Sequence, residues 1–499
     1  MELLLNGFTQ ILQPSVFILL IGGVIAGIII GALPGLTATM GVALFLPITF
    51  GMDAITGILL LIGVYFGGVY GGSVASILLN TPGTPASAAT ALDGYPFTKQ
   101  GKAGKALGIS VISATSGGLI STLMLIFIAP QLAQIALGFS APEMFGLALF
   151  GLSIISSISG GSVLKGLIAG VFGLVISTIG MDPMTSYPRF TYGNLSLLNG
   201  LNFIPVMIGL FAISEALVIM EEELTGGKGI KKVIVGYALP KWNELKRLWG
   251  TIFRSGFIGT FIGIIPGAGA DIAAFVAYNE ARRFSKKEEK ETFGKGNPKG
   301  IAAPEAAGNG VTGGAFVPLL TLGIPGDAVT AIMLGALVVQ GIQPGPQLFQ
   351  TSGDLVFTLF AGMLAANVLM LIFGLSGIRL FTTILKIPKN IIAAVIIVLS
   401  TVGSFAIANN YFDVFTMLGA GIIGYFMKKF DFPASPIVLA LILGPMAESE
   451  MRRALVMSEG SFMIFLQRPI SLAFIILAIV SLVLPLIMGQ IKKKKATVN

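Results

Sequence analysis

The stretches Leu79-Asn80-Thr81-Pro82-Gly83-Thr84 and Gly323-Ile324-Pro325-Gly326-Asp327 interrupt two long apolar runs, and they decide the fold. A Pro-Gly pair inside a membrane-length apolar segment removes one backbone donor and loosens the next turn. Backbone groups then lack partners at a depth where lipid offers none. Broken helices of this kind typically bind an anion at a helix N-terminus and a coupling cation at free carbonyl groups. The two stretches therefore predict the core of a solute-binding site.

The composition is typical of a polytopic membrane protein. The 499 residues are 54% hydrophobic and 11% charged, with a mean hydropathy of +0.90. Apolar stretches of the roughly 20 residues that span a bilayer recur across residues 14–488. The chain has no Cys and no His, which excludes disulfides and imidazole proton relays and leaves carboxylates for proton coupling. No GxxxxGK[ST] sequence is present, and we predict no enzyme activity and no cofactor.

Four proline landmarks occur twice in the same order, which indicates an internal duplication. The offsets between the two copies are 232, 243, 246 and 250 residues, a slow drift that small insertions explain. The pairs are Pro34 with Pro266, Pro82 with Pro325, Pro142 with Pro388, and Pro183 with Pro433.

Loop charges predict that the two halves have opposite orientations. Residues 46–56 contain no Lys or Arg, whereas their counterpart, residues 282–299, contains seven. The imbalance reverses at the next loop, where three lysines lie in residues 99–105 and none in residues 341–354. Because Lys and Arg mark the cytoplasmic side, equivalent loops lie on opposite sides. The halves therefore form an inverted-topology repeat, the architecture of many secondary transporters.

The predicted fold is an all-α polytopic membrane protein with re-entrant or broken helices. The segments around Pro34 and Pro266 are each predicted to form a hairpin that enters the membrane and returns to the side from which it started. Besides these two hairpins, the chain is expected to cross the membrane about 11 times. We expect the N-terminus outside and the lysine tail at residues 492–495 in the cytoplasm, although Arg452 and Arg453 then fall on the outer side. The predicted parts are residues 1–225 (first repeat), 226–250 (charged interfacial linker), 251–455 (second, inverted repeat) and 456–499 (terminal helix and basic tail).

Hydroxyl groups and glycines surround each Pro-Gly pair. One such motif alone favours plain helix kinking and close packing, but four motifs in equivalent positions favour ligand binding. Helix N-terminal amides and hydroxyls can hold a carboxylate without a buried Lys or Arg. The substrate-binding candidates from these motifs are Gly35, Thr37, Thr39, Asn80, Thr81, Pro82, Gly83, Thr84, Ser87, Gly267, Gly269, Asn309, Gly323, Pro325, Gly326 and Thr330.

Three carboxylates, Asp271, Glu305 and Asp327, lie within or beside the motifs in apolar surroundings. An ionisable group inside a membrane segment is costly and usually functional, so these three are candidates for carrying the coupling cation, H⁺ or Na⁺. A surface position beside the basic loop is the alternative for Glu305. Arg189 either meets an anionic substrate at the outer mouth or forms an ion pair that anchors its loop.

Long stretches of the chain resemble the large membrane subunit of bacterial tripartite tricarboxylate transporters, the TctA family. The resemblance runs over about residues 14–446. The stretches that carry it include GALPGLTATMGVALFLPITFG (31–51), YFGGVYGGSVASILLNTPGTPASAATALDGYPFTKQGKAGKALG (65–108), GMDPMTSYPRFTYG (180–193), FIGIIPGAGADIAAFVAY (261–278), FGKGNPKGIAAPEAAGNG (293–310) and GGAFVPLLTLGIPGDAVTAIMLGALVVQGIQPGPQLF (313–349).

This resemblance implies a secondary transporter subunit in the bacterial inner membrane that imports citrate-like or other carboxylates with an ion gradient. It also implies a small TctB-like membrane subunit of about four helices and a TctC-like periplasmic solute receptor. The family's two signatures add Gly72 and Ser73 to the candidates and coincide with Asn80, Glu305 and Asn309. Asp327 stands where we expect a small residue in many relatives, so the resemblance carries over no particular substrate.

The sequence favours a transporter subunit in which the two halves expose one central site alternately. A membrane channel or a scaffold that binds no solute is the alternative from another class. An intramembrane hydrolase is a weaker alternative, because the duplication explains the GAGAD stretch at residues 267–271 better than a catalytic aspartate does.

Overall fold

The structure, a computed structural model, describes residues 2–496 apart from 34, 35, 82, 154–162, 183, 225–238, 268 and 379–388. Several predictions lie outside the described residues. They concern the site candidates Gly35 and Pro82, four of the proline landmarks (Pro34, Pro82, Pro183 and Pro388) and much of the predicted linker.

The chain forms two compact units, and each unit draws on both halves of the sequence. Unit 1 comprises Met1–Ala133 and Glu215–Leu399, and unit 2 comprises Gln134–Ser214 and Ser400–Asn499. The predicted repeats, by contrast, are continuous segments of the sequence. Their boundaries are not tested by this division into units and stay a prediction. The helices of unit 1 are α1 (Glu2–Ile11), α2 (Pro14–Ala32), α3 (Ala38–Phe45), η1 (Leu46–Thr49), α4 (Ala54–Leu79), α5 (Ser87–Lys99), α6 (Ala103–Ala136, which ends in unit 2), α11 (Ser214–Leu224, which begins in unit 2), α12 (Trp242–Ile264), α13 (Gly269–Arg283), α14 (Lys287–Lys290), α15 (Pro298–Leu322), α16 (Ala328–Val339), α17 (Leu348–Thr351), α18 (Gly353–Ser376) and α20 (Lys389–Ala408, which ends in unit 2).

Unit 2 is also helical, with one short hairpin of strands in its described part. The two strands are antiparallel and pair Gly180 with Arg189. Its elements are α7 (Ala141–Ser153), α9 (Val163–Ser177), β1 (Gly180–Met181), β2 (Pro188–Arg189), η2 (Leu195–Leu197), α10 (Phe203–Ile208), the π-helical turn η3 (Gly209–Ile213), α21 (Tyr411–Lys429), α22 (Ser435–Met457), α23 (Ile464–Gln467) and α24 (Pro469–Ala496).

The helices confirm the predicted all-α membrane class. Five described helices are long and apolar enough to cross a membrane: Pro14–Ala32, Ala54–Leu79, Ala103–Ala136, Phe203–Glu223 and Gly353–Ser376. Shorter apolar helices, such as α16, follow the predicted breaks. The expected number of membrane crossings stays a prediction. A broken helix crosses the membrane as two short pieces, and helix length alone does not count such crossings.

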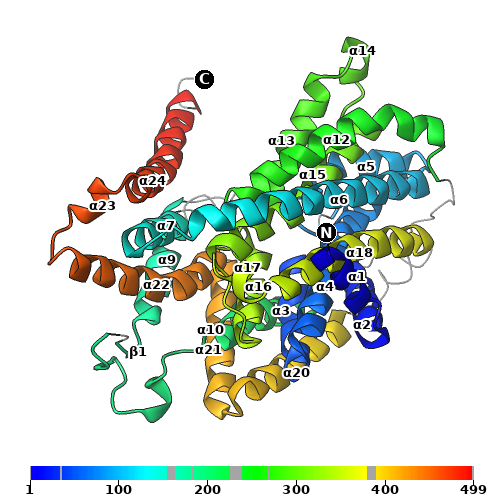
Figure 1. The fold of residues 1–499 in the computed structure, drawn as a ribbon. Helices are drawn as coiled ribbons and strands as arrows, with labels where there is room; N and C mark the ends of the chain where they lie inside the picture. Colours follow the sequence, from blue (N-terminus) through cyan, green and yellow to red (C-terminus); the bar gives the residue numbers. More distant parts are fainter. Residues whose placement is uncertain are drawn as a thin grey trace. The chain divides into compact units, whose positions relative to one another are not determined.

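Two hairpins have the predicted form. Helix α2 and the short α3 both contact α4, and in the second repeat α12 and α13 both contact α15 (Figure 1). Glycines of α2 approach the α4 backbone so closely that a Cβ would collide with it, and the contacts advance in the same direction along both helices. Helices α2 and α4 are therefore parallel, which requires the intervening chain to return to the face from which α2 started. The approaching pairs are Gly23 with Leu60, Gly27 with Val64 and Gly31 with Gly68 in the first repeat, and Gly259 with Ala307 and Gly263 with Val311 in the second.

Both broken helices end in the same backbone conformation. Helix α4 begins with Asp53 accepting a hydrogen bond from the Thr56 N–H (3.0 Å), and it ends at Asn80 in the left-handed region (φ 58°). Helix α15 begins after the cap Asn297, and it ends at Gly323, also left-handed (φ 70°). Asn and Gly are the residues that adopt this C-terminal cap at least cost, and the following proline prevents the helix from continuing.

The equivalent helices α4 and α15 cross antiparallel. The ring of Tyr65 lies 6.3 Å from that of Phe316, and Ser73 hydrogen-bonds to Glu305, so the numbering rises on one helix as it falls on the other. Antiparallel packing of equivalent helices is what an inverted repeat requires.

The glycine contact between α2 and α4 can be tested with two variants of one helix. A Cβ at Gly27 would lie 2.9 Å from the Gly68 nitrogen, whereas a Cβ at Gly22 has nothing within 4 Å. We expect Gly27→Val to lower the free energy of unfolding by about 1–3 kcal/mol more than Gly22→Val does, because only the first overpacks the interface. Thermal unfolding of the two purified variants in detergent measures the difference. Equal stability of the two variants would contradict the proposed close approach.

Candidate functional site

The chain after each broken helix folds back along its own helix. In the first repeat the Gly83 N–H donates to the Gly72 carbonyl (3.3 Å), while the side chains of Asn80 and Thr81 stay exposed. In the second repeat Gly326 lies against Ala315, where a Cβ would come within 2.6 Å of the Ala315 Cα. We name residues 80–84 the first loop and residues 323–327 the second loop. Backbone groups of both loops thus find hydrogen-bond partners within the protein, such as Gly83 N–H in the first loop and Ile324 N–H, which donates to the Pro318 carbonyl (3.3 Å), in the second.

Hydroxyl groups cap the start of α5. Thr84 and Ser87 bond reciprocally, since the Thr84 N–H donates to Ser87 Oγ (3.1 Å) and the Ser87 N–H donates to Thr84 Oγ1 (3.3 Å). The Ser76 hydroxyl of α4 donates to Ser87 Oγ (2.8 Å) and ties the cap to the broken helix. The predicted candidates Thr84 and Ser87 are thus buried and adjacent at a helix N-terminus.

A carboxylate caps the start of α16 at the equivalent position. Asp327 Oδ1 accepts from the Thr330 N–H (2.8 Å), and the Asp327 N–H donates to Thr330 Oγ1 (2.8 Å). The buried Tyr65 of α4 donates its hydroxyl to Asp327 Oδ2 (2.6 Å). Both Asp327 oxygens therefore have protein partners.

The turn of each hairpin reaches the loop of its own repeat. The Gly267 N–H donates to the Gly326 carbonyl (2.7 Å). A Cβ at Gly83 would lie 2.6 Å from the Gly31 carbonyl oxygen at the end of α2. In the second repeat this hydrogen bond joins the two Pro-Gly motifs directly, and in the first repeat Gly83 packs against the end of α2.

The remaining hairpin candidates have local roles. Thr37 caps α3 by accepting from the Met40 N–H (3.2 Å), and Thr39 is half-buried in its first turn. Gly269 starts α13 with φ 68°, and Asp271 is partly exposed in that first turn. In the described part of the chain the Glu305 carboxylate bonds to Ser73, Thr90 and Ser110 and not to Asp271, so these two coupling-ion candidates do not form one cluster.

Glu305 lies at the centre of a buried hydroxyl cluster. Its carboxylate accepts from Ser73 (2.5 Å) on α4, from Thr90 on α5 and from Ser110 (2.9 Å) on α6. The residue is 3% exposed, and no ion pair with Lys or Arg reaches it within the described part of the chain. The surface alternative for Glu305 is therefore wrong. Helix α15 starts seven residues earlier and carries the side chain into the core directly after the basic loop.

Asn309 follows Glu305 by one helical turn. Its amide nitrogen donates to the Glu305 carbonyl (3.2 Å), while its Oδ1 is buried without a hydrogen-bond partner in the described structure. The side chain is 1% exposed. An unused buried acceptor of this kind is uncommon in native proteins, and it keeps Asn309 among the binding candidates.

Helix α5 contains two buried polar residues, Thr90 and Asp93, that the sequence patterns above did not single out. With the candidates Thr84 and Ser87 they form a series of buried polar residues in which each follows the last by three positions. Residues three apart lie on one face of a helix, so this spacing was the signal that could have identified Thr90. Ser110 and Tyr65 gave no comparable signal.

Asp93 fastens the end of α5 to the basic loop before α15. Its Oδ1 accepts from the N–H groups of Gly294 (2.9 Å), Gly296 (2.9 Å) and Asn297 (2.7 Å), and the Tyr278 hydroxyl donates to Oδ2 (2.8 Å). Such a nest of backbone N–H groups suits a carboxylate. Asp93 is therefore fully engaged within the protein.

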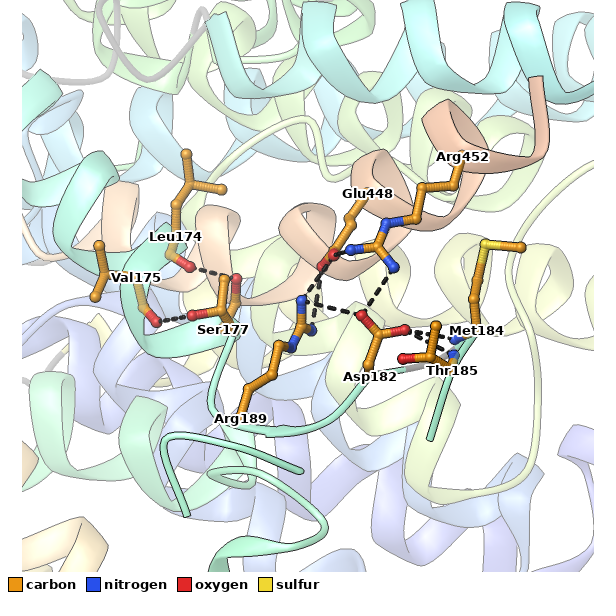
Figure 2. Close-up of polar contacts among 10 residues, drawn as sticks. Leu174, Val175, Ser177, Asp182, Met184, Thr185, Arg189, Glu448 and Arg452 are labelled. Atoms are coloured by element: carbon orange, nitrogen blue, oxygen red, sulfur yellow. Dashed lines mark hydrogen bonds and ion pairs between the residues drawn. The ribbon is translucent and has the colours of Figure 1, made fainter. Parts of the chain in front are cut away.

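In unit 2, two arginines and two carboxylates form one network (Figure 2). Arg189 binds Glu448 through two nitrogens (2.7 and 3.2 Å) and lies 3.5 Å from Asp182. Arg452 binds Asp182 (2.8 Å) and Glu448 (2.7 Å). These contacts favour the loop-anchoring alternative for Arg189. They also balance the charge of Arg452, one of the two arginines that conflict with the predicted topology.

Hydrogen bonds set the charge state of Asp182. The backbone N–H groups of Thr185 and Met184, followed by the Arg452 guanidinium, hold the pKa of Asp182 well below its usual range. The hydrogen bond to Glu448 raises the pKa of Arg189. Asp182 and Arg189 are thus both ionised at neutral pH, and the network joins the loop after α9 to α22.

The antiparallel broken helices, with loops that fold back onto them, define a polytopic membrane protein of the inverted-repeat, transporter-like class. A family model described as the tripartite tricarboxylate transporter TctA family matches residues 17–439. The chain belongs to this family and is therefore a tripartite tricarboxylate transporter subunit.

Two proteins of Agrobacterium vitis are similar to the chain. One, described as an uncharacterized 52.8 kDa protein in the TAR-I ttuC' 3' region, is 36% identical over 490 residues, which cover 98% of this chain and 97% of that protein. The other, described as an uncharacterized protein in the TAR-II ttuC' 3' region, is 35% identical over 229 residues, which cover 46% of this chain and 94% of that protein.

The depressed pKa of Asp182 predicts a pH dependence of stability. A carboxylate whose pKa is lower in the folded than in the unfolded state stabilises the protein above its unfolded pKa of about 3.9, and this contribution is lost as the pH falls toward the folded pKa. We expect Asp182→Asn to be less stable than wild type at pH 6, with a difference that narrows below about pH 4. Thermal unfolding in detergent between pH 6 and pH 3 measures this difference.

The exposed Asp431 of the same unit provides the control. Asp431→Asn should follow the wild-type pH profile. A stability difference between Asp182→Asn and wild type that stays constant with pH would contradict the assigned role of the ionised carboxylate.

Proposed function

We propose that the chain is the large transmembrane subunit of a receptor-dependent secondary transporter that imports a small, tricarboxylate-like carboxylate. A cation gradient, of H⁺ or Na⁺, drives the import, and the two repeats expose a central site to either side in turn. A periplasmic solute receptor delivers the substrate, and a small membrane subunit completes the complex. The protein lies in the inner membrane with its N-terminus outside and its C-terminus in the cytoplasm.

The observation that carries this proposal is the pairing of two broken helices at one crossing. Tyr65 hydrogen-bonds to Asp327 of the second loop, and the Gly72 carbonyl accepts a hydrogen bond from Gly83 of the first loop. The two residues are seven positions apart on α4. At 1.5 Å per residue their anchoring points are about 10 Å apart along the helix, close enough for both loops to serve one small solute. An inverted repeat lets such a site open to each side with little change in the site itself.

The first loop is the better place for a substrate carboxylate. There the α5 N-terminus is capped only by neutral hydroxyls, and the exposed Asn80 and Thr81 add an amide and a hydroxyl. At the second loop the Asp327 carboxylate already occupies the N-terminus of α16, so a second anion there would be repelled. We therefore expect the substrate's carboxylate on the first loop and its remaining groups toward Asn309 and Thr330.

The class is tested by transport in proteoliposomes that contain the subunit with its small partner and receptor. A pH gradient and a Na⁺ gradient are imposed separately, and uptake of radiolabelled citrate and of smaller carboxylates is measured. Gradient-driven accumulation together with counter-flow supports a transporter. Flux that is independent of both gradients and shows no counter-flow supports a channel and would overturn the proposal.

Asn80→Gly tests the substrate site without disturbing the backbone. Glycine adopts the left-handed conformation of Asn80 freely, so only the amide is removed. We expect uptake at low substrate concentration to fall about tenfold or more, because one hydrogen bond to a charged group is lost. Glu459→Gly replaces another exposed left-handed residue and should leave uptake unchanged. Unchanged uptake by Asn80→Gly at normal membrane levels would remove Asn80 from the site.

A further inference from the structure

Glu305 is held by oxygen atoms from three other helices. The donors Ser73, Thr90 and Ser110 come from α4, α5 and α6, and all three side chains are at most 3% exposed. We name these four residues the Glu305 cage. A buried carboxylate with no basic partner is expensive to keep ionised, so its retention at this place indicates a function.

The chemistry of the cage suits a carboxyl group that changes its protonation state. A hydroxyl both donates and accepts, whereas a backbone N–H or a Lys only donates. The ionised carboxylate accepts three hydrogen bonds in the geometry described above. After protonation, the new O–H donates to one hydroxyl, which turns to accept it. The cage therefore satisfies both states with the same residues.

The spacing of the cage oxygens fits protons better than a metal cation. Ligand oxygens lie about 2.3–2.6 Å from a cation of the size of Ca²⁺ or Na⁺, which places neighbouring ligands about 3.3–3.7 Å apart. The Ser73 and Ser110 oxygens lie 2.5 and 2.9 Å from the carboxylate oxygens, distances that hold a hydrogen between two atoms. No group of three acidic side chains suited to a metal occurs in the described part of the chain.

The other titratable groups near α15 either bond to partners other than Glu305 or are tyrosine hydroxyls. Asp93 is held by backbone N–H groups and by Tyr278, Asp327 is held by Tyr65 and Thr330, and Tyr70 of α4 lies within electrostatic reach of Glu305. On the helices farther along, Lys105 of α6 pairs with Glu244 of α12, Arg254 of α12 lies over Phe284, and Asp271 is partly exposed in the first turn of α13. Glu305 is thus the carboxyl group of this region whose partners are hydroxyls alone.

Two residues of the Glu305 cage lie next to residues that hold the first loop. Ser73 follows Gly72, the residue whose carbonyl accepts from Gly83 of the first loop. Thr90 lies on α5 three residues, about one turn, after Ser87 of the cap. A change in how Glu305 binds these two helices therefore acts directly on the position of the first loop.

We propose that Glu305 carries the coupling proton of transport and that Ser73, Thr90 and Ser110 position it. This inference rests on the proposed function. The O–H bond forms at Glu305 on the side of higher proton concentration and breaks on the other side, where the proton passes to water.

The test uses the complete complex in proteoliposomes with the membrane potential clamped at zero and with the carboxylate that the wild type transports. A pH difference of one unit then drives about tenfold accumulation for each coupled proton. Glu305→Gln resembles the protonated side chain in shape and cannot release a proton. We expect this variant to lose the pH-driven accumulation while it retains counter-flow of labelled against unlabelled substrate, which requires no net proton movement. The exposed Asp354→Asn, on α18 of the same unit, should behave like wild type.

A second variant guards against a folding defect in the first. Thr90→Val keeps the shape of the side chain and removes one donor to the ionised carboxylate. We expect the pH midpoint of uptake to rise by about one unit, because the ionised state loses a hydrogen bond. A merely structural role of Thr90 would lower the uptake rate without moving the midpoint.

Two results would overturn the inference while the transporter assignment stands: wild-type accumulation driven by a Na⁺ gradient alone, or pH-driven accumulation retained by Glu305→Gln. Absence of counter-flow in the wild type would instead overturn the proposed function.

Discussion

The structure depends on one constraint, the need to satisfy backbone groups where a helix is broken inside a membrane. Lipid offers no hydrogen bonds, so each loop must find its partners in the protein. The protein meets this need with left-handed caps at Asn80 and Gly323 and with loops that fold back onto their own helices. As a result the loop backbones are held, while the side chains of Asn80 and Thr81 remain accessible. Holding the backbone without covering the side chains is what a solute site at a helix break requires.

Close helix packing makes the buried polar cluster possible. Ser and Thr hydroxyls are short, and they reach a carboxylate on another helix only when the two backbones lie close together. Gly117 of α6 lies so near Ala306 that a Cβ would come within 2.7 Å of the Ala306 carbonyl carbon. Ala306 follows Glu305 directly, so this contact brings Ser110 of the same helix within reach. The many glycines of the sequence therefore serve the chemistry as well as the packing.

The breaks, the duplication and the antiparallel relation of the halves could be predicted because each leaves a local or periodic mark in the sequence. The partners of Glu305 could not, since Ser73, Thr90 and Ser110 are 232, 215 and 195 residues away. The spacing of polar residues on α5 marks Thr90 but not its partner, and nothing local distinguishes Ser110 from other hydroxyls in apolar helices. The basic loop suggested a surface position for Glu305, but fewer than two helical turns separate Lys299 from the buried carboxylate.

The two repeats share a scaffold and differ in chemistry. With the offset of 243 residues, Asp327 corresponds to Thr84, Glu305 corresponds to Ile62, and Tyr65 corresponds to Gly308. The carboxylates thus lie in one copy, and the neutral helix N-terminus lies in the other. A fully symmetric site would place like charges at both loops and would repel either the anion or the cation. Under the proposed function, this difference between the copies assigns the substrate and the coupling ion to separate residues of a symmetric fold.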